Sequence, residues 1–437
     1  MLIILHNSRN IKMKIKQQIT QFNDSLASLK EFAELIEPFL LQRKESLKIP
    51  MPDKMMSVLD TVLKQTKNID EIKASDLSKL KDALNILSSV SNFSEKINPA
   101  PLSINVEDLN NMGQLMDANP TFMQRISSTF NQDLHIANLF KNNLISLLSS
   151  VEWFFAQLLH NFYNRYPESP GINKKVLTFE DLKNFDTLKD AERYLIEKKI
   201  EELLRGSIDS WFEYLRDDLK IKINFVKPFI DELIEISQRR NLFVHNGGIV
   251  NTIYLSKVTL KLRDGIEINE PLKIDKLYVE NSINLMQTVF TLLAAELWKK
   301  LYPNDQERGE LLTTITFDYL MQGRWKDALS ISEFIIIDEF QDSTIKTISH
   351  LNNWLSKKRL GNWDEISAEL NKLDFSDKQT KYQLALASLK EDHDFFFNLL
   401  PKSIAKEEIS LIEIQLFPIF KEMRDHDKFI KFLEENN

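Results

Sequence analysis

The chain has 437 residues, a net charge of −8, only nine glycines and thirteen prolines, and no cysteine. This length predicts two or three domains, and the small number of helix-breaking residues favours a mainly α-helical fold. The missing cysteines exclude disulfides, thiolate metal sites and a cysteine nucleophile, and the negative charge excludes a broad basic face for gripping duplex DNA.

Residues 1–135 are predicted to form an N-terminal helical region, to which we assign no function. A helical pattern from Lys14 to Lys44 stops before two prolines, and a second pattern begins at Pro52, a residue suited to a first helical turn. The segment 98–101, Asn-Pro-Ala-Pro, is the clearest linker, and a further break falls at Asn119-Pro120. No apolar run approaches the roughly 20 residues of a membrane helix, so we expect a cytoplasmic protein.

Residues 136–301 are predicted to form the middle domain. It should begin with a long helix over residues 136–166, whose apolar residues recur at helical spacing: Leu139, Leu144, Leu147, Leu148, Val151, Phe154, Phe155, Leu158 and Leu159. Thr178 and Asp181 read as a capping box that opens a short helix. Residues 258–262 and 266–268 flank Asp264-Gly265 and predict a small β-hairpin. A final helix from Ile283 to Leu301 closes the domain.

One helix of this domain is expected to begin at Pro228 and to stop at Asn246-Gly247-Gly248, because glycine accepts a left-handed helix end. Near its end, Asn241 and His245 are four residues apart and share one face. Arg240 precedes His245 by five residues, which places it about 140° around the helix axis. A second copy of this helix, brought in across a dimer axis, could complete a site for one phosphate.

These residue types suit RNA cleavage. Histidine transfers protons near neutral pH, so His245 is the candidate general acid or base. Arginine stays charged, so Arg240 is the candidate clamp for a phosphate whose charge grows in the transition state, and Asn241 would orient the imidazole or the phosphate. No metal or cofactor is needed, because the 2′-OH of RNA is an internal nucleophile held next to the phosphorus.

The stretch Arg240-Asn241-Leu242-Phe243-Val244-His245 resembles the R-x(4–6)-H signature of HEPN ribonucleases, with helices before and after it. The resemblance covers about residues 136–300. It implies a helical bundle that forms a homodimer about the motif helices and cleaves RNA, tRNA included, without a metal. It also implies a toxin or effector role in bacterial antiphage defence, through abortive infection or a toxin–antitoxin system.

Alternatives remain open from the sequence. Arg239 also satisfies the motif spacing, and Gln238 and Glu235 are further candidate supporting residues on the same helix. His245 could instead cap the helix end, where an imidazolium is favoured, with both arginines solvated. The alternative function is a non-catalytic scaffold that assembles a protein or RNA complex.

Residues 302–437 are predicted to form a TPR-like α-solenoid. Gly323-Arg324-Trp325 resembles Gly361-Asn362-Trp363, and the segment 392–400 resembles the segment 425–433. Aligning Trp325, Trp363, Phe396 and Phe429 gives steps of 38, 33 and 33 residues, near the period of about 34 of stacked helix pairs. We expect each aromatic residue to fill the gap between consecutive pairs, and the repeats to bind a protein regulator or trigger.

The segment 334–343, Phe-Ile-Ile-Ile-Asp-Glu-Phe-Gln-Asp-Ser, looks like the Walker B segment of superfamily-1 helicases. That chemistry needs an upstream glycine-rich loop that ends in Gly-Lys, and no glycine of this chain is followed by lysine. Phe334, Ile337 and Phe340 have helical spacing instead. We therefore interpret the segment as part of the first helical repeat.

Overall fold

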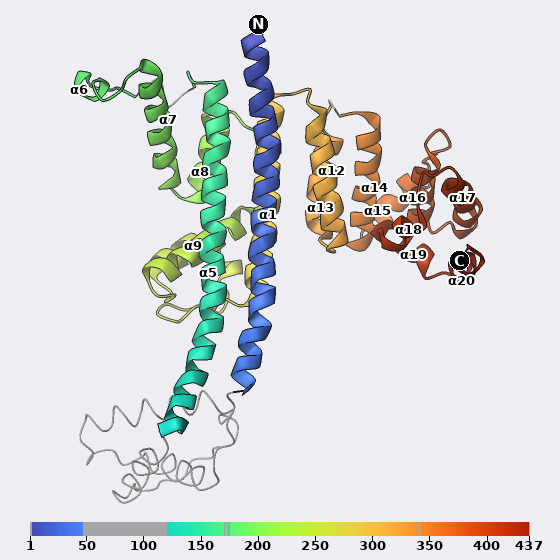
Figure 1. Ribbon diagram of the computed structural model, residues 1–437, viewed down its shortest axis with the longest axis horizontal. Coiled ribbons are helices and arrows are strands. Elements are labelled where there is room, and N and C mark those ends of the chain that lie inside the picture. Colours follow the sequence, from blue (N-terminus) through green and yellow to red (C-terminus); the bar gives the residue numbers. More distant parts are fainter. Residues whose placement is uncertain (1, 47–119, 170–171, 173–174, 340, 437) are drawn as a thin grey trace, which may run out of the picture. The chain divides into compact units, whose positions relative to one another are not determined.

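The computed structural model describes residues 2–46, 120–169, 172, 175–339 and 341–436 (Figure 1). The described residues are mainly helical and contain no strand, so the predicted all-α class is confirmed. Packing divides the chain into a larger unit of residues 1–27, 147–272 and 280–437 and a smaller unit of residues 28–146 and 273–279. The domain boundaries predicted after residues 135 and 301 separate segments expected to fold independently. Packing of the chain into units does not test this, so the boundaries remain a prediction.

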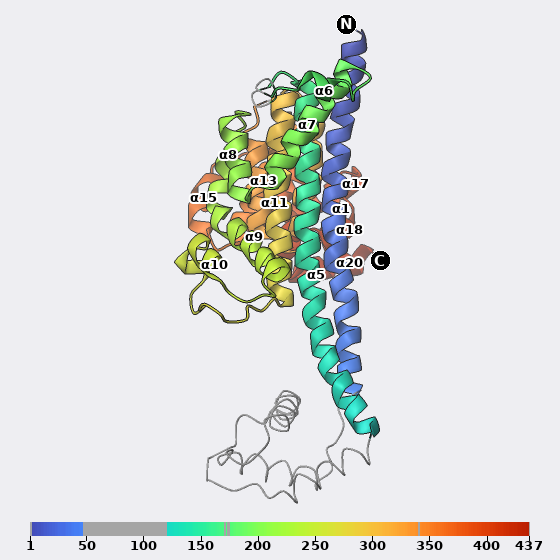
Figure 2. The same ribbon diagram turned by 90° about the vertical axis from the view of Figure 1, so that its left-hand side faces the viewer.

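The larger unit has a core in which residues 14–27 take part. These residues belong to helix α1 (Leu2–Ser46), which runs antiparallel to helix α5 (Pro120–Arg165) (Figure 2). Phe22 stacks on Phe154 of α5 with ring centroids 4.1 Å apart, and lies 6.5 Å from Phe290 of helix α11 (Lys276–Leu301). Asn161 Nδ2 donates a hydrogen bond to Gln18 Oε1 at 2.5 Å, and both residues are buried. The first helix therefore packs together with α5 and α11.

Helix α5 follows the prediction closely in its apolar face. All nine residues predicted for that face are at most 9% exposed, although the helix begins at Pro120 and not at residue 136. Phe155 also stacks on Trp211 of helix α8 (Ile208–Asp217) with ring centroids 4.6 Å apart. The repeat of apolar residues therefore fixes how this helix is oriented toward the core.

Shorter elements connect α5 to the motif helix. The predicted capping box is confirmed, because Thr178 and Asp181 exchange side-chain and backbone hydrogen bonds at the start of helix α6 (Phe179–Leu182). Helix α7 (Leu188–Leu204) precedes α8, and a 3₁₀ turn, η2 (Asn224–Phe229), leads directly into α9 (Ile230–His245). Pro228 lies in η2, so the α-helical part of the motif helix begins two residues later than predicted.

Helix α9 ends at the predicted glycine stop. Gly247 and Gly248 have φ angles of +61° and +83°, which other residues rarely adopt. The Leu242 carbonyl, near the end of the helix, accepts hydrogen bonds from the amides of Asn246 at 2.8 Å and Gly248 at 3.0 Å. The chain then turns into helix α10 (Thr252–Lys257).

Replacing Gly248 with alanine is expected to destabilise the fold more than replacing Gly247. Both changes force a residue with a Cβ into the left-handed region, which costs about 1–2 kcal/mol. A Cβ at Gly248 would also lie 2.6 Å from Phe243 Cε1, whereas a Cβ at Gly247 meets nothing within 4 Å. Overpacking should therefore add about 1 kcal/mol in Gly248→Ala. Urea unfolding of the two variants measures this difference, and equal losses would contradict the proposed overlap.

The predicted β-hairpin over residues 258–268 is wrong. The turn exists, because Gly265 has a φ of +70°, but Leu260–Leu262 form a 3₁₀ turn, η3. The backbone partners of the following segment lie elsewhere: Val250 donates to the Glu270 carbonyl at 2.9 Å, and Leu272 donates to the Gly248 carbonyl at 2.8 Å.

Packing explains this difference. Val258, Leu262 and Ile266 cover a small core around Tyr254, while Leu260 is 74% exposed. A strand would place residues 258, 260 and 262 on the same face of the hairpin. Burying Val258 and Leu262 in this core is therefore more favourable than forming the predicted short strand.

The C-terminal third consists of consecutive helix pairs. The elements are α12 (Gln306–Met321), α13 (Trp325–Ile336), α14 (Ser343–Arg359), α15 (Trp363–Leu370), α16 (Thr380–Lys390), α17 (His393–Ala405), α18 (Leu411–Leu416), η4 (Pro418–Phe420), α19 (Lys421–Arg424) and α20 (Asp427–Asn436). Figure 1 shows them from orange to red.

The helix starts correct the predicted alignment of the repeats. Trp325, Trp363 and His393 are the first residues of α13, α15 and α17, so Trp363 corresponds to His393 and not to Phe396. Phe396 is buried as predicted, but the two tryptophans are only partly buried. Lys358 Nζ lies 4.9 Å from the Trp363 ring centroid, so this partly buried ring contacts a cation.

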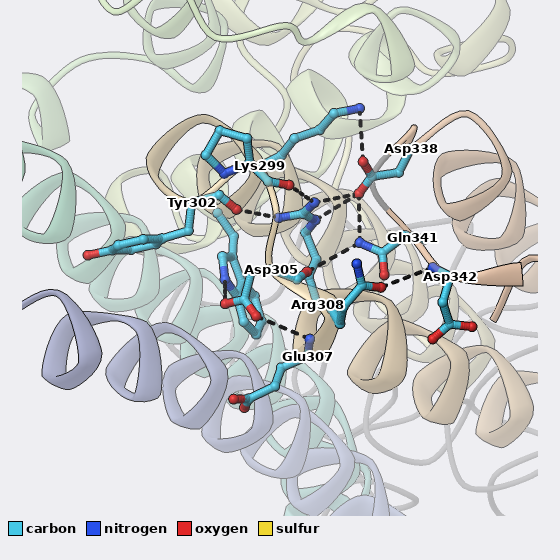
Figure 3. A network of polar contacts seen from close by, with 11 residues as sticks. Lys299, Tyr302, Asp305, Glu307, Arg308, Asp338, Gln341 and Asp342 are labelled. Carbon is cyan, nitrogen blue, oxygen red and sulfur yellow. Dashed lines mark hydrogen bonds and ion pairs between the residues drawn. The ribbon is translucent and has the colours of Figure 1, made fainter. Parts of the chain in front are cut away.

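A buried ion pair connects the first two helix pairs (Figure 3). Arg308 of α12 and Asp338, after α13, have side chains 0% and 1% exposed, and their closest N···O distance is 2.6 Å. The guanidinium also donates to the Tyr302 and Pro303 carbonyls at 2.9 and 2.8 Å. Gln341 Nε2 donates to Asp338 Oδ2 at 3.1 Å.

This network gives the segment that looks like a Walker B motif a structural role. Asp338 and Gln341 lie in the connection between α13 and α14, and Phe334 is buried in α13. Ile337, expected on the same helical face, is 67% exposed, and Phe340 lies outside the described residues.

Candidate functional site

The predicted motif residues line one open cavity of about 510 Å³ in the larger unit. Its walls come from α5, from the connection between α7 and α8, from α9 and from the start of α10. Arg240, Asn241, His245 and Gln238 all line it. Such a volume suits a site for a nucleotide-sized ligand.

Arg240 is held at the wall of this cavity by helix α5. Its NH2 group contacts Glu152 Oε1 in an ion pair, and the two side chains are 21% and 33% exposed. Arg240 Nε is buried and has no hydrogen-bond partner among the described residues. The guanidinium therefore keeps an unused donor beside a carboxylate that only partly neutralises it.

Arg239 makes a different set of contacts. Its Nε donates to Glu235 Oε1 at 2.7 Å, and the Tyr254 hydroxyl donates to the same carboxylate oxygen at 2.8 Å. Burial, followed by the Glu235 charge, raises the pKa of Tyr254 above its usual value. Neither Arg239 nor Glu235 lines the cavity, so two of the three candidate supporting residues lie outside it.

His245 occupies the last turn of α9, where its side chain is exposed. It has no hydrogen-bond or ion-pair partner among the residues that the structure describes. Asn241, four residues earlier, is partly buried and forms no hydrogen bond with His245. The imidazole is therefore open to solvent and to a ligand in the cavity, and Asn241 does not orient it here.

The cavity also contains polar residues that the sequence did not predict. Glu152 lies 88 residues before Arg240, on another helix, and no local pattern connects the two. Arg205 follows α7 and pairs with Glu201 at 2.8 Å on the surface. Asn246, Asn251, Ser207 and Ser237 are further polar residues of the lining. Asn246 follows the motif directly in the sequence.

Comparisons of the chain with protein-family models, with curated proteins and with solved structures find no match. Across the described part of the chain, no group of three or more metal-ligating side chains could hold a metal ion. None of the helices in that part is both long and apolar enough to cross a membrane.

Proposed function

We propose that the chain is an endoribonuclease of HEPN type that works without a metal ion. The observation that supports this most is that Arg240, Asn241 and His245 line one cavity, and that the His245 side chain has no polar partner among the described residues. An imidazole that transfers protons and a guanidinium that stabilises the phosphate charge are sufficient for cleavage of an RNA linkage by its own 2′-OH.

In the proposed reaction, the 2′-OH of the substrate attacks the neighbouring phosphorus. The bond between phosphorus and the 5′ oxygen breaks, which leaves a 2′,3′-cyclic phosphate and a 5′-OH. His245 takes the proton from the 2′-OH or gives a proton to the departing 5′ oxygen. Arg240 donates to the phosphate oxygens as their charge grows. Asn241 hydrogen-bonds the phosphate.

One histidine cannot be base and acid at the same time, so a second copy of the chain would supply the other. Ile253 lines the cavity and is 62% exposed, and Val244 and Ile249, close in sequence to the lining residues His245 and Asn251, are 45% and 36% exposed. Exposed apolar side chains beside a polar site suit an interface between two copies. We therefore propose a homodimer in which the α9 helices approach each other.

The C-terminal helix pairs would act as a TPR-like regulator-binding region of a cytoplasmic toxin or antiphage effector. A cavity of about 230 Å³ among α12, α14, α16 and η4 has mainly apolar walls, with Leu320, Leu355 and Tyr382 among its residues. This surface suits an apolar segment of a protein regulator. The RNA substrate, tRNA among the candidates, would enter at the cavity around Arg240.

Cleavage of total RNA by the purified chain in EDTA tests this function. Arg240→Ala is expected to lower the cleavage rate by about 10²–10³-fold, because it removes a donor to the transition-state charge. Arg216→Ala is the matched control: Arg216 is exposed, pairs with Asp217 at 2.7 Å and lies outside the cavity lining, so its loss should not change the rate. Equal rates for the wild type and Arg240→Ala would overturn the assignment of Arg240.

The scaffold alternative rests on the Glu152–Arg240 ion pair. If this pair stays closed, the guanidinium is occupied and the cavity serves no chemistry. RNA that remains intact with the wild type under every condition, including added candidate activators, would favour the scaffold.

A further inference from the structure

A second cavity of about 650 Å³ lies in the larger unit among α11, α13, α14 and residues 222–229. It shares no lining residue with the cavity around Arg240. Its walls are mainly apolar, and the rings of Phe229, Phe334 and Trp354 are 7%, 5% and 4% exposed. A largely apolar hollow of this size with a few polar groups is the usual form of a small-molecule site.

Asn353 supplies a hydrogen-bond acceptor to this cavity. The Ser332 hydroxyl donates its only proton to the Leu329 carbonyl at 2.9 Å, so it can only accept from Asn353, whose Nδ2 lies 3.3 Å away. This fixes the orientation of the amide and leaves Oδ1 without a donor among the described residues. Asn353 is 5% exposed and lines the cavity. This carbonyl oxygen can therefore accept a hydrogen bond from a ligand in the cavity.

Glu296 adds a carboxylate to the same cavity. Burial raises the pKa of this carboxyl, opposed by the charges of Lys299 and Lys222. Glu296 forms no hydrogen bond or ion pair with any residue that the structure describes. The two other carboxylates of the lining, Glu333 and Glu369, are exposed. The acceptors therefore extend from the half-buried interior to the rim.

Two aromatic residues of the cavity wall contact ammonium groups of the protein itself. Lys299 Nζ lies 5.6 Å from the ring centroid of Phe334, and Lys326 Nζ lies 5.2 Å from that of Phe229. An ammonium group near an aromatic face is stabilised by the negative charge of the ring face. Lys222 and Lys357 line the cavity as well, so the lining contains three carboxylates and two ammonium groups.

We propose that this cavity binds an aliphatic polyamine. Its ammonium groups donate to Glu296 and to Asn353 Oδ1, and its methylene chain lies along Phe229 and Trp354. The Glu296 carboxylate, which has no ion-pair partner among the described residues, and the Asn353 carbonyl favour a cation, and the apolar walls favour a chain with methylene groups between its charges. This site is independent of the proposed ribonuclease function.

Titration calorimetry of the full chain with spermidine at physiological salt tests the proposal. The wild type should bind spermidine saturably, and Glu296→Gln should weaken binding by about tenfold or more, which corresponds to the loss of about 1.4 kcal/mol. Glu310→Gln removes an exposed carboxylate of α12 outside the cavity lining and should leave binding unchanged. Glu296→Gln should fold normally, because burial already opposes the charge that it removes; circular dichroism checks this.

Three outcomes would overturn the proposal. Spermidine binding that is not saturable would show that the cavity is no polyamine site. Equal weakening by Glu296→Gln and Glu310→Gln would show only general attraction to a negative protein. Lys357→Ala removes a cation of the lining and should leave spermidine binding unchanged or strengthen it. Loss of binding in this variant, or saturable ATP binding that depends on Lys357, would show that the site takes an anion.

Discussion

Replacing Asp338 with alanine is expected to lower the free energy of unfolding by about 3–5 kcal/mol. The change leaves the Arg308 guanidinium, which is 0% exposed, without its counter-ion in an interior that does not solvate it. It also removes one of the two acceptors of Gln341 Nε2, which keeps the Asp305 carbonyl at 3.3 Å (Figure 3). Urea unfolding followed by circular dichroism measures the loss.

Two further variants make this prediction specific. Glu339→Ala changes an exposed neighbour and should alter the unfolding free energy by no more than about 0.5 kcal/mol. The double variant Arg308→Met with Asp338→Leu removes both charges and should recover much of the loss, because an uncompensated buried charge costs more than an absent pair. A double variant as unstable as Asp338→Ala would show that lost packing, and not the unpaired charge, is the cause.

Replacing His245 with alanine is expected to lower the rate of RNA cleavage by about 10²–10⁴-fold, the usual contribution of a general acid or base. The exposed imidazole supports no packing, so the variant should unfold at the same urea concentration as the wild type. His135→Ala, which removes another exposed histidine, is the matched control and should cleave at the wild-type rate. Quantifying the cleaved RNA over time on denaturing gels measures all three rates.

The chemistry of the substrate provides an independent check on the same proposal. A substrate with a single 2′-deoxy nucleotide at the scissile linkage lacks the proposed nucleophile and should stay intact with the wild type. Cleavage of that linkage, or products without a 2′,3′-cyclic phosphate, would point to an external nucleophile and contradict the proposed mechanism.

Local patterns predicted the features that depend on neighbouring residues. The apolar repeat of α5 identified the buried face, because side chains three and four residues apart share one side of a helix. The glycine pair after His245 identified the end of α9 for the same kind of local reason. The separate role of Arg239 also had a local signal: Glu235 lies four residues before it on the same helix, a spacing that allows an ion pair.

Features that depend on distant residues were beyond these patterns. Glu152 contacts Arg240 across 88 residues, and nothing in either helix identifies the other as its partner. The prediction of a β-hairpin was wrong for a related reason. The backbone of residues 269–272 forms hydrogen bonds with residues 248–250, which lie before the predicted hairpin in the sequence. The open acceptor of Asn353 depends on the orientation of its amide, which Ser332 of another helix fixes.

The packing of α1 against α11 sets an order for folding during synthesis. Asn23 donates a hydrogen bond to Thr291, 268 residues later in the chain. At the usual pace of about 5–20 residues per second, α1 leaves the ribosome roughly 13–54 seconds before this partner. Throughout that interval the apolar side chains of the nascent helix, Phe22 included, lack the α11 residues against which they pack in the folded protein. Chaperones that shield apolar segments should therefore engage the N-terminus, and deleting residues 14–27 should expose apolar surface on α11 in the finished protein.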